Sequence, residues 1–333
     1  MRLFRTFMVV AGLILLVPQL FAQNPANPIQ LALLRWYSAN TATQVVSGST
    51  CSSPKGLAFD GSHMWVACSN SAELQEFNTS DNATVATISL AGTNPFYLLY
   101  DGANIWALST TAGTLTEVQA STGAIVRTVT IGAGLGGFTF DGTYIWVSNT
   151  TAVTVTKVLA TTGAIVSTTS LSGTCSLPTA MAYDSVNAAV WVVCNGAPAV
   201  AKLSSTGTVV KKVQFGSSLG ALNMVFDGTN LWVSSREGST FSAASKINVT
   251  TAVLTSYSLP VNSMPVAVTF DGLYIWAAEN DGHVTKLVAS TGVIVSTYPT
   301  GGNSPVFAAF DGGNIWIANG SLNLLNQYTI SKM

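Results

Sequence analysis

The chain of 333 residues is short of charge, of histidine and of long apolar runs. Charged residues make up 8% of it, the formal net charge is −1, and only two residues are histidine. Such a weak and balanced charge creates no positive field that would attract nucleic acid or an anionic membrane surface. After the N-terminal region, no apolar run approaches the roughly 18 residues that a membrane-spanning helix needs. We therefore expect no nucleic-acid partner and no membrane span once the N-terminal region is removed.

The N-terminal region has the pattern of a secretory signal. Arg2 and Arg5 precede an apolar core from Phe7 to Val17, and Ala22 offers a small residue before a cleavage point. Residues 1–22 are therefore predicted to be a signal peptide, although an uncleaved anchor is the alternative. Residues 23–41 are expected to form an N-terminal lead-in. The mature protein would be secreted, or lie in the periplasm or cell envelope, where disulfides persist.

One stretch, Phe140 to Val147, is repeated along the whole chain as Phe-Asp-Gly-x-x-Ile-Trp-Val with variations. Its aspartates lie 40 to 44 residues apart, which is the length of a propeller blade of four strands. Seven copies therefore predict an all-β fold, a seven-bladed β-propeller of four-stranded antiparallel blades over residues 42–333. The repeated aspartates are Asp60, Asp101, Asp141, Asp184, Asp227, Asp271 and Asp311, and the tryptophans are Trp65, Trp106, Trp146, Trp191, Trp232, Trp276 and Trp316.

Each copy shows the same order of strands and turns. In residues 265–300, strands are predicted at 266–270, 275–278, 284–288 and 293–298, with an Asp-Gly turn and a Thr-Gly turn between pairs. The residue alternation has a period of two, and the turn glycines tolerate positive φ. The Asp side chain is expected to cap its turn, and the Trp ring to fill the seam with the neighbouring blade.

The ring must be closed by pairing the two ends of the chain. The last copy supplies strands at 306–310, 315–318 and 324–329 but no fourth strand, whereas residues 42–47 precede the first copy and resemble a fourth strand. We therefore expect an N-terminal strand to complete the last blade, which removes a free edge. Because residues 31–37 resemble a further strand, a closure with two strands from each end is the alternative.

The four cysteines have matching positions in two copies. Cys51 and Cys175 lie nine residues before the aspartate, and Cys68 and Cys194 lie three after the tryptophan. The loop before the first strand and the end of the second strand lie on the same face of a blade, so each pair can approach to disulfide distance. We predict the disulfides Cys51–Cys68 and Cys175–Cys194. Four free buried thiols, or a zinc site lacking a completing histidine, are the alternatives.

The copies differ most at the position three residues after the tryptophan and in the adjoining loops. A ligand site, if present, is expected on that face. The candidate residues are Ser109, Asn149, Ser235, Arg236, Glu237, Glu279, Asn280 and Asn319. A rim that is merely solvated is the simpler interpretation.

Catalytic motifs are scarce. His63 falls in the first Asp-Gly turn and His283 at the start of a third strand, on opposite faces of a blade, and each is most simply an exposed turn residue. The single carboxylate of each Asp-Gly turn falls short of the ligands that calcium needs. No metal and no cofactor are therefore expected.

The repeat resembles that of the YVTN-type secreted bacterial propellers, which are close to the NHL repeats. The residues that carry the resemblance are 155–158 (Val-Thr-Lys-Val), 162–163 (Thr-Gly), 141–142 (Asp-Gly) and 146–149 (Trp-Val-Ser-Asn). The resemblance covers residues 42–330 and implies the fold. Such propellers serve mostly as binding or scaffold modules, so the resemblance implies a partner such as a carbohydrate, a peptide or an envelope protein.

A second resemblance is to the streptogramin (virginiamycin B) lyases, which are also seven-bladed with Asp-Gly and Trp repeats. It implies a metal-assisted lyase or hydrolase with magnesium, in which Glu279 and His283 would act. The other copies lack the glutamate that this family carries three residues after the tryptophan. We therefore expect a secreted, non-catalytic binding or scaffold module, with the lyase or hydrolase as the alternative.

Overall fold

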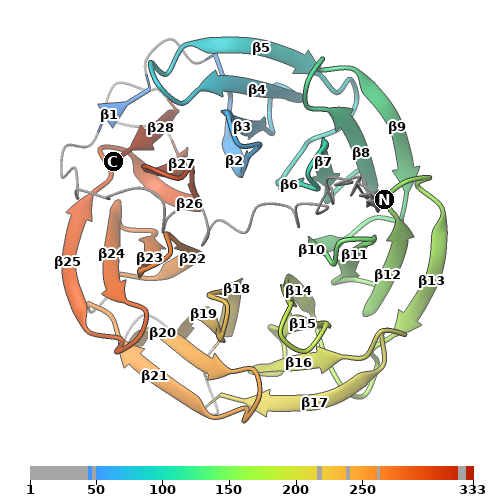
Figure 1. Ribbon diagram of the computed structural model, residues 1–333, viewed down its shortest axis with the longest axis vertical. Coiled ribbons are helices and arrows are strands. Elements are labelled where there is room, and N and C mark those ends of the chain that lie inside the picture. Colours follow the sequence, from blue (N-terminus) through green and yellow to red (C-terminus); the bar gives the residue numbers. More distant parts are fainter. Residues whose placement is uncertain (1–43, 47–49, 216–219, 238–240, 261–262, 322–327) are drawn as a thin grey trace, which may run out of the picture.

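The computed structural model describes residues 44–46, 50–215, 220–237, 241–260, 263–321 and 328–333. They form seven antiparallel sheets of four strands, arranged as blades around a central axis (Figure 1). Within these ranges every element is a strand, so no helix there could cross a membrane. The predicted seven-bladed β-propeller is confirmed. The predicted signal peptide (1–22) and lead-in (23–41) lie outside the described residues.

Blades 1 to 6 each use four consecutive strands, and the first strand of each blade lies nearest the axis (Figure 1). The strands are: blade 1, β2 (Pro54–Phe59), β3 (His63–Cys68), β4 (Glu73–Asn78) and β5 (Thr84–Ser89); blade 2, β6 (Tyr97–Tyr100), β7 (Asn104–Ser109), β8 (Thr114–Gln119) and β9 (Ile125–Thr130); blade 3, β10 (Leu135–Phe140), β11 (Tyr144–Asn149), β12 (Thr154–Leu159) and β13 (Ile165–Ser170); blade 4, β14 (Pro178–Asp184), β15 (Ala189–Cys194), β16 (Ala199–Leu203) and β17 (Val209–Gln214); blade 5, β18 (Gly220–Phe226), β19 (Asn230–Glu237), β20 (Phe241–Asn248) and β21 (Leu254–Ser258); blade 6, β22 (Pro265–Phe270), β23 (Tyr274–Glu279), β24 (His283–Val288) and β25 (Ile294–Pro299).

Blade 7 joins the two ends of the chain. It contains β26 (Asn303–Phe310), β27 (Ile315–Ser321) and β28 (Thr329–Lys332), and its outer strand is the N-terminal β1 (Gln44–Val45). Gln44 pairs with Lys332 and Val45 with Ser331. Three strands from one end and one from the other therefore close the ring, as predicted. The alternative strand at 31–37 lies outside the described residues.

The third strand of blade 7 differs from its predicted position at 324–329. It begins at Thr329, and its register places Lys332 opposite Trp316, the pairing of tryptophan and lysine that blades 3 to 6 also show. Residues 322–327, which include most of the predicted strand, lie outside the described ranges. In the described residues, the strand therefore follows the register of tryptophan and lysine seen in the other blades.

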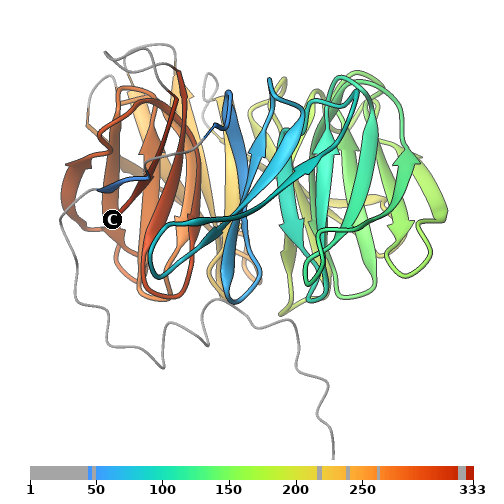
Figure 2. The ribbon, with the colours of Figure 1, turned by 90° about the horizontal axis from the view of Figure 1, so that it is seen from above.

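The strands run between two faces of the ring (Figure 2). We call the face with the Asp turns, which join first to second strands, the turn face. The opposite face, where second strands end and blades are connected, is the loop face. Each tryptophan lies on the second strand and packs into the apolar cluster shared with the next blade; Trp191 packs with Leu231 and Val233 of blade 5, for example. The tryptophans are buried to 3% exposure or less, so every seam has the predicted ring filler.

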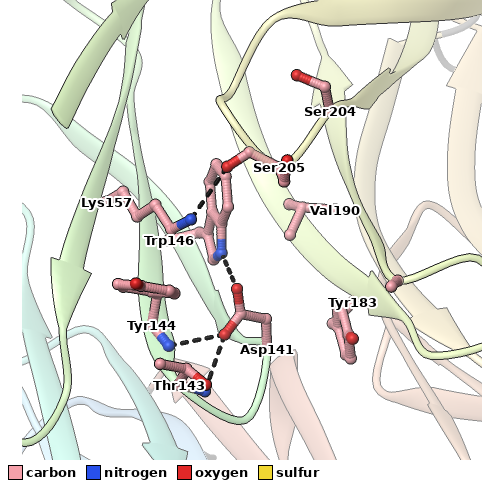
Figure 3. Close-up of a pocket in the computed structure, with 10 residues that line it drawn as sticks. Asp141, Thr143, Tyr144, Trp146, Lys157, Tyr183, Val190, Ser204 and Ser205 are labelled. Carbon is pink, nitrogen blue, oxygen red and sulfur yellow. Dashed lines mark hydrogen bonds between the residues drawn. The ribbon is translucent and has the colours of Figure 1, made fainter. Parts of the chain in front are cut away.

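The repeated aspartate caps its turn and also holds the tryptophan. In blade 3, Oδ1 of Asp141 accepts hydrogen bonds from the backbone N–H groups of Thr143 and Tyr144, and Oδ2 accepts one of 2.7 Å from the Trp146 indole (Figure 3). The indole bond recurs in all seven blades and is longest, 3.3 Å, in blade 4, where the turn has two extra residues. One carboxylate therefore fixes both the turn and the ring that fills the seam.

Both predicted disulfides are confirmed. Cys51 and Cys68 have Cα atoms 5.0 Å apart, and Cys175 and Cys194 have Cα atoms 5.1 Å apart. Each joins the loop leading into a first strand to the end of the second strand, on the loop face. Disulfides persist in oxidising compartments, so the pair indicates an extracellular or periplasmic environment.

Candidate functional site

The position three residues after each tryptophan is buried, not open on the loop face. Ser109, Asn149, Ser235, Glu279 and Asn319 are all exposed by 4% or less. In blade 3 the loop leading into the first strand contacts this position through the Ala133 carbonyl, and in blades 1 and 4 the same loop carries the cysteine of the disulfide. We expected these residues to be exposed around the opening on the loop face, but the structure shows that these five are buried.

Three of the buried residues serve the blade itself. The amide of Asn149 donates to the Ala133 carbonyl at 3.0 Å, and its oxygen accepts from the backbone N–H of Ala152. Asn319 donates to the hydroxyls of Thr329 and Ser331. Ser235 shares a hydrogen bond of 3.3 Å with Ser245. These contacts tie second strands to third strands or to loops, which is a structural role.

Four other predicted residues are placed differently. Asn280 is exposed at the end of β23, and the side chains of Arg236 and Glu237, at the end of β19, lie outside the described residues. Ser109 is buried, and its hydroxyl has no hydrogen-bond partner within the described part of the chain. The predicted set is therefore split between the interior and the edge of the loop face.

Glu279 is the most unusual of the buried residues. It is 1% exposed, and neither carboxylate oxygen has a partner in hydrogen-bond geometry among the described residues. Burial raises the pKa of Glu279 to about 7; the hydroxyl of Thr285 opposes that shift and the charge of Asp281 adds to it. A carboxyl group with this pKa can exchange a proton near neutral pH.

His283 is the register partner of Glu279 across the β23–β24 hairpin. Its Nδ1 lies 3.2 Å from a carboxylate oxygen of Asp281, and its side chain is 45% exposed. The two predicted alternative residues are thus neighbours on the backbone. One is enclosed in the blade, however, while the other faces an exposed carboxylate.

A recess of about 240 Å³ opens on the turn face between blades 3 and 4, lined by residues that include Asp141, Trp146, Lys157 and Tyr183 (Figure 3). The Lys157 ammonium lies 3.8 Å from the centre of the Tyr144 ring and 4.7 Å from that of Trp146. It donates to the Ser205 carbonyl of blade 4 at 3.0 Å. This lysine therefore bridges the seam beside the capping aspartate.

The same position holds a lysine in blades 3 to 7 and a glutamate in blades 1 and 2. The lysines over their tryptophan rings are Lys157, Lys202, Lys246, Lys286 and Lys332. Lys246 and Lys332 also donate to carbonyls of the next blade, as Lys157 does. The glutamates are Glu76, opposite Trp65, and Glu117, opposite Trp106.

Blade 1 collects three groups that could hold a metal ion. Nδ1 of His63 lies 2.9 Å from Oε1 of Glu76 and 3.6 Å from Oδ2 of Asp60, and the three potential ligand atoms are all within 4.8 Å of one another. Burial raises the pKa of Glu76; the nearby His63 opposes that shift and the Asp60 charge adds to it. His63, expected in a solvated turn, is instead the first residue of β3 and is paired.

Sequence reasoning missed this turn-face chemistry, although a signal for it was present. In the first four copies the cross-strand partner lies eleven residues after the tryptophan, as glutamate twice and then lysine twice. Whether this partner residue lies close to the aspartate depends on the register between the second and third strands, and the repeat pattern alone does not reveal that register.

No family model and no curated protein sequence matches the chain. Solved structures do: a streptogramin B lyase has a TM-score of 0.71 and 18% identity, over 87% of this chain and 96% of that one. A catalytically inactive virginiamycin B lyase from Staphylococcus aureus, solved with quinupristin, has a TM-score of 0.74 and 20% identity, over 87% and 98%. Hydrazine synthase of Kuenenia stuttgartiensis has a TM-score of 0.72 and 14% identity, over 85% and 97%.

Identities this low carry the fold and not the chemistry. The lyases and the synthase named here share the architecture, and the predicted distant similarity to lyase-type propellers is confirmed at the level of structure. In its fold, the chain is a seven-bladed β-propeller similar to the streptogramin B lyases.

Proposed function

We propose that the protein is a non-catalytic binding or scaffold module, secreted or held in the periplasm or cell envelope, that takes its partner along the perimeter of the ring. The observation that carries this proposal is the exposure of apolar residues at the start of the outer strands. On the loop face, by contrast, most of the polar residues that differ between blades are buried and hydrogen-bonded inside their own blades.

The outer strands form the perimeter (Figure 1) and expose β-branched residues to solvent. Val85, Val126, Val166, Val210 and Val295, each on a different outer strand, are exposed by 46% to 60%. In three of these strands the valine adjoins an exposed isoleucine, as Ile125 with Val126, Ile165 with Val166 and Ile294 with Val295. Exposed apolar side chains that lie together mark candidate interaction sites.

Charge does not protect most of these edges. The outer strands β5, β13 and β21 contain neither a charged residue nor a proline, whereas β25 contains no charged residue but ends in Pro299. Free edge strands usually carry lysine or proline to prevent pairing with other chains. An uncharged edge with apolar side chains suits an extended polypeptide that adds as a further strand. A peptide or an envelope protein is therefore the favoured partner class, and a carbohydrate is the other class that the test includes.

The test compares a perimeter variant with a variant of the loop face. Val166→Lys places a charge on the outer edge of blade 3, and the control Asn280→Lys places one at the exposed end of β23. Both proteins and the wild type are applied to an array of extended peptides and an array of glycans. We expect peptide binding that Val166→Lys weakens and Asn280→Lys leaves unchanged. Binding to glycans alone, or loss of binding only in Asn280→Lys, contradicts the proposal.

A catalytic role is the second candidate. The observation that favours it is the buried Glu279, whose carboxylate has no hydrogen-bond partner among the described residues and whose pKa is raised to about 7. Magnesium prefers an octahedral oxygen shell that includes several waters. Around Glu279 the described residues offer one carboxylate and the hydroxyls of Thr285 and Ser263. Because Glu279 is 1% exposed, the several waters that magnesium keeps have no access to the carboxylate, so the site does not fit such an ion and we derive no step through it. Magnesium-dependent thermal stabilisation that Glu279→Ala abolishes would support the catalytic candidate.

A further inference from the structure

The seven blades repeat the same arrangement of turn aspartate, tryptophan and cross-strand partner, so blade 1 can be compared with the other six at these positions. In blades 3 to 7 a lysine lies over the tryptophan ring whose indole N–H donates to the aspartate that caps the turn. In blade 4, for example, Lys202 lies 3.8 Å from Oδ2 of Asp184. In these five blades a cation therefore lies over the ring that the aspartate holds, and in blade 4 it also contacts the aspartate.

Blade 2 has a glutamate at the lysine position and supplies the cation from the neighbouring strand. Glu117 pairs with Arg127 across strands β8 and β9, and the guanidinium lies 2.7 Å from the carboxylate. A buried carboxylate without such a cation would carry a large desolvation cost. In blade 2, Arg127 on the neighbouring strand therefore neutralises the glutamate that stands at the lysine position.

Blade 1 has the glutamate without the arginine. Glu76 pairs with Ala86, at the position that Arg127 occupies in blade 2. The side chains of Asp60 and Glu76 are only 8% and 9% exposed, and within the described residues His63 is the one basic side chain within 4.0 Å of either carboxylate. Two enclosed carboxylates here share one imidazole, which is a weaker base than lysine or arginine.

The three groups have the spacing and chemistry of a metal site. Zinc binds imidazole nitrogen at about 2.0–2.1 Å and carboxylate oxygen at about 2.0–2.2 Å, so its ligand atoms lie about 3 to 4 Å apart. Nδ1 of His63 lies 2.9 Å from Glu76 Oε1 and 3.6 Å from Asp60 Oδ2. An imidazole beside carboxylates favours a borderline transition-metal ion over magnesium or calcium, which prefer oxygen ligands alone.

We propose that Asp60, His63 and Glu76 form a binding site for a divalent transition-metal ion of the zinc type. The ion lies at the seam between blades 1 and 2 and replaces the cation that lysine or arginine supplies in the other blades. Three protein ligands leave coordination positions for water, and the 33% exposure of the His63 side chain opens the site to solvent on the turn face. This site is independent of the perimeter surface and of Glu279.

The experiment titrates metal-free protein with zinc chloride in a calorimeter and measures the melting temperature with and without zinc. We expect one ion to bind per chain and the melting temperature to rise. Cobalt, used as a spectroscopic probe, should develop visible absorption bands when it binds. His63→Gln removes the nitrogen ligand and should abolish all three signals.

The second variant, Glu76→Lys, recreates the arrangement of blades 3 to 7, so it should fold without metal and fail to bind zinc. Two controls, His283→Gln and Glu279→Gln, alter the other histidine and the other buried carboxylate, and both should bind zinc as the wild type does. The proposal is overturned if the wild type binds neither zinc nor cobalt, since His63 and Glu76 then form an ion pair only. It is also overturned if His63→Gln and Glu76→Lys bind zinc as tightly as the wild type.

Discussion

At the scale of single residues, the repeated aspartate has more partners than a turn cap needs. Its two oxygens have different partners. One accepts hydrogen bonds from backbone N–H groups of the turn, and the other accepts a hydrogen bond from the indole N–H of the tryptophan. The geometry of a short turn is thereby linked to the orientation of a large ring in the seam between two blades.

Asp141→Ala is expected to lower the free energy of unfolding by about 1–3 kcal/mol, because the buried indole N–H and two turn N–H groups lose their acceptor. Asp141→Asn keeps one acceptor oxygen and should cost less. Urea denaturation followed by tryptophan fluorescence measures both. If the alanine variant were as stable as the wild type, the aspartate would not hold the ring.

Glu279 should make stability depend on pH. Its folded pKa of about 7 lies above that of an unfolded glutamate, so the folded state binds the proton more tightly. This contribution is fully present below about pH 4 and is lost as the pH rises through about 7. The upper limit of this contribution, from the pKa difference, is about 3.5 kcal/mol.

The measurement is the free energy of unfolding at several values between pH 4 and pH 8, for the wild type and for Glu279→Gln. The variant carries no titrating group at this position, so its curve should fall less steeply and its stability should exceed that of the wild type at pH 8. Parallel curves for the two proteins would show that the carboxyl group is not enclosed in the way described.

At the scale of the elements, the unit that matters is the pair of strands that carries tryptophan and its cross-strand partner. Lysine there covers the ring that the aspartate holds, and in blades 3, 5 and 7 it reaches a carbonyl group of the next blade. The pair therefore joins neighbouring blades through polar contacts as well as apolar packing. Blades 1 and 2 have a glutamate at this position, so their seams contain an additional carboxylate where the other blades have a lysine, and the fold is the same.

Lys157→Met is expected to reduce stability by about 1–2 kcal/mol, because it removes the cation above two rings and the hydrogen bond to Ser205. Lys211→Met, on the exposed part of β17, is the matched control and should change little. Thermal denaturation of both variants distinguishes a bridge from a solvated charge. Equal effects of the two substitutions would argue against the bridge.

At the scale of the whole molecule, the ring depends on β1. This strand contributes backbone pairing to β28, and Val46 beside it is buried to 4% exposure. Without it, blade 7 would have three strands and an open edge.

Two truncations test the closure. A chain that begins at Thr50 lacks β1, and one that begins at Thr43 keeps it. The shorter chain should lose about 2 kcal/mol or more, from the burial of Val46 and the strand pairing, and should unfold faster. Chemical denaturation and unfolding kinetics measure the difference. Equal stability of the two chains would mean that another segment closes the ring.

Most of the fold could be predicted because it repeats. A period of 40 to 44 residues, alternation along each strand and Asp-Gly turns all indicate the same blade, and seven copies leave little freedom in how they assemble. The disulfides followed from matched offsets in two copies. The third strand of blade 7 was misplaced because its register depends on the pairing of Trp316 with Lys332.

The candidate site was harder to predict, since repetition identifies where blades differ but not whether those positions are exposed. Asn149 and Asn319 stand at the position that varies between the copies, as a ligand-binding residue is expected to do. Both are nevertheless buried and hydrogen-bonded within their blades. His63 was assigned to solvent because its partner Glu76 lies on another strand.

The sequence by itself determined the repeat of four strands, the number of blades and the two disulfides, because local periodicity and repeated offsets specify them. It left an alternative for the closure of the ring, which the pairing of β1 with β28 decided. Only the tertiary structure decided which side chains meet: Asp141 with Trp146, and Asp60 with His63 and Glu76. The physical reason is that these contacts depend on the register between strands and on the neighbouring blade, and both are set when the blades pack around the axis.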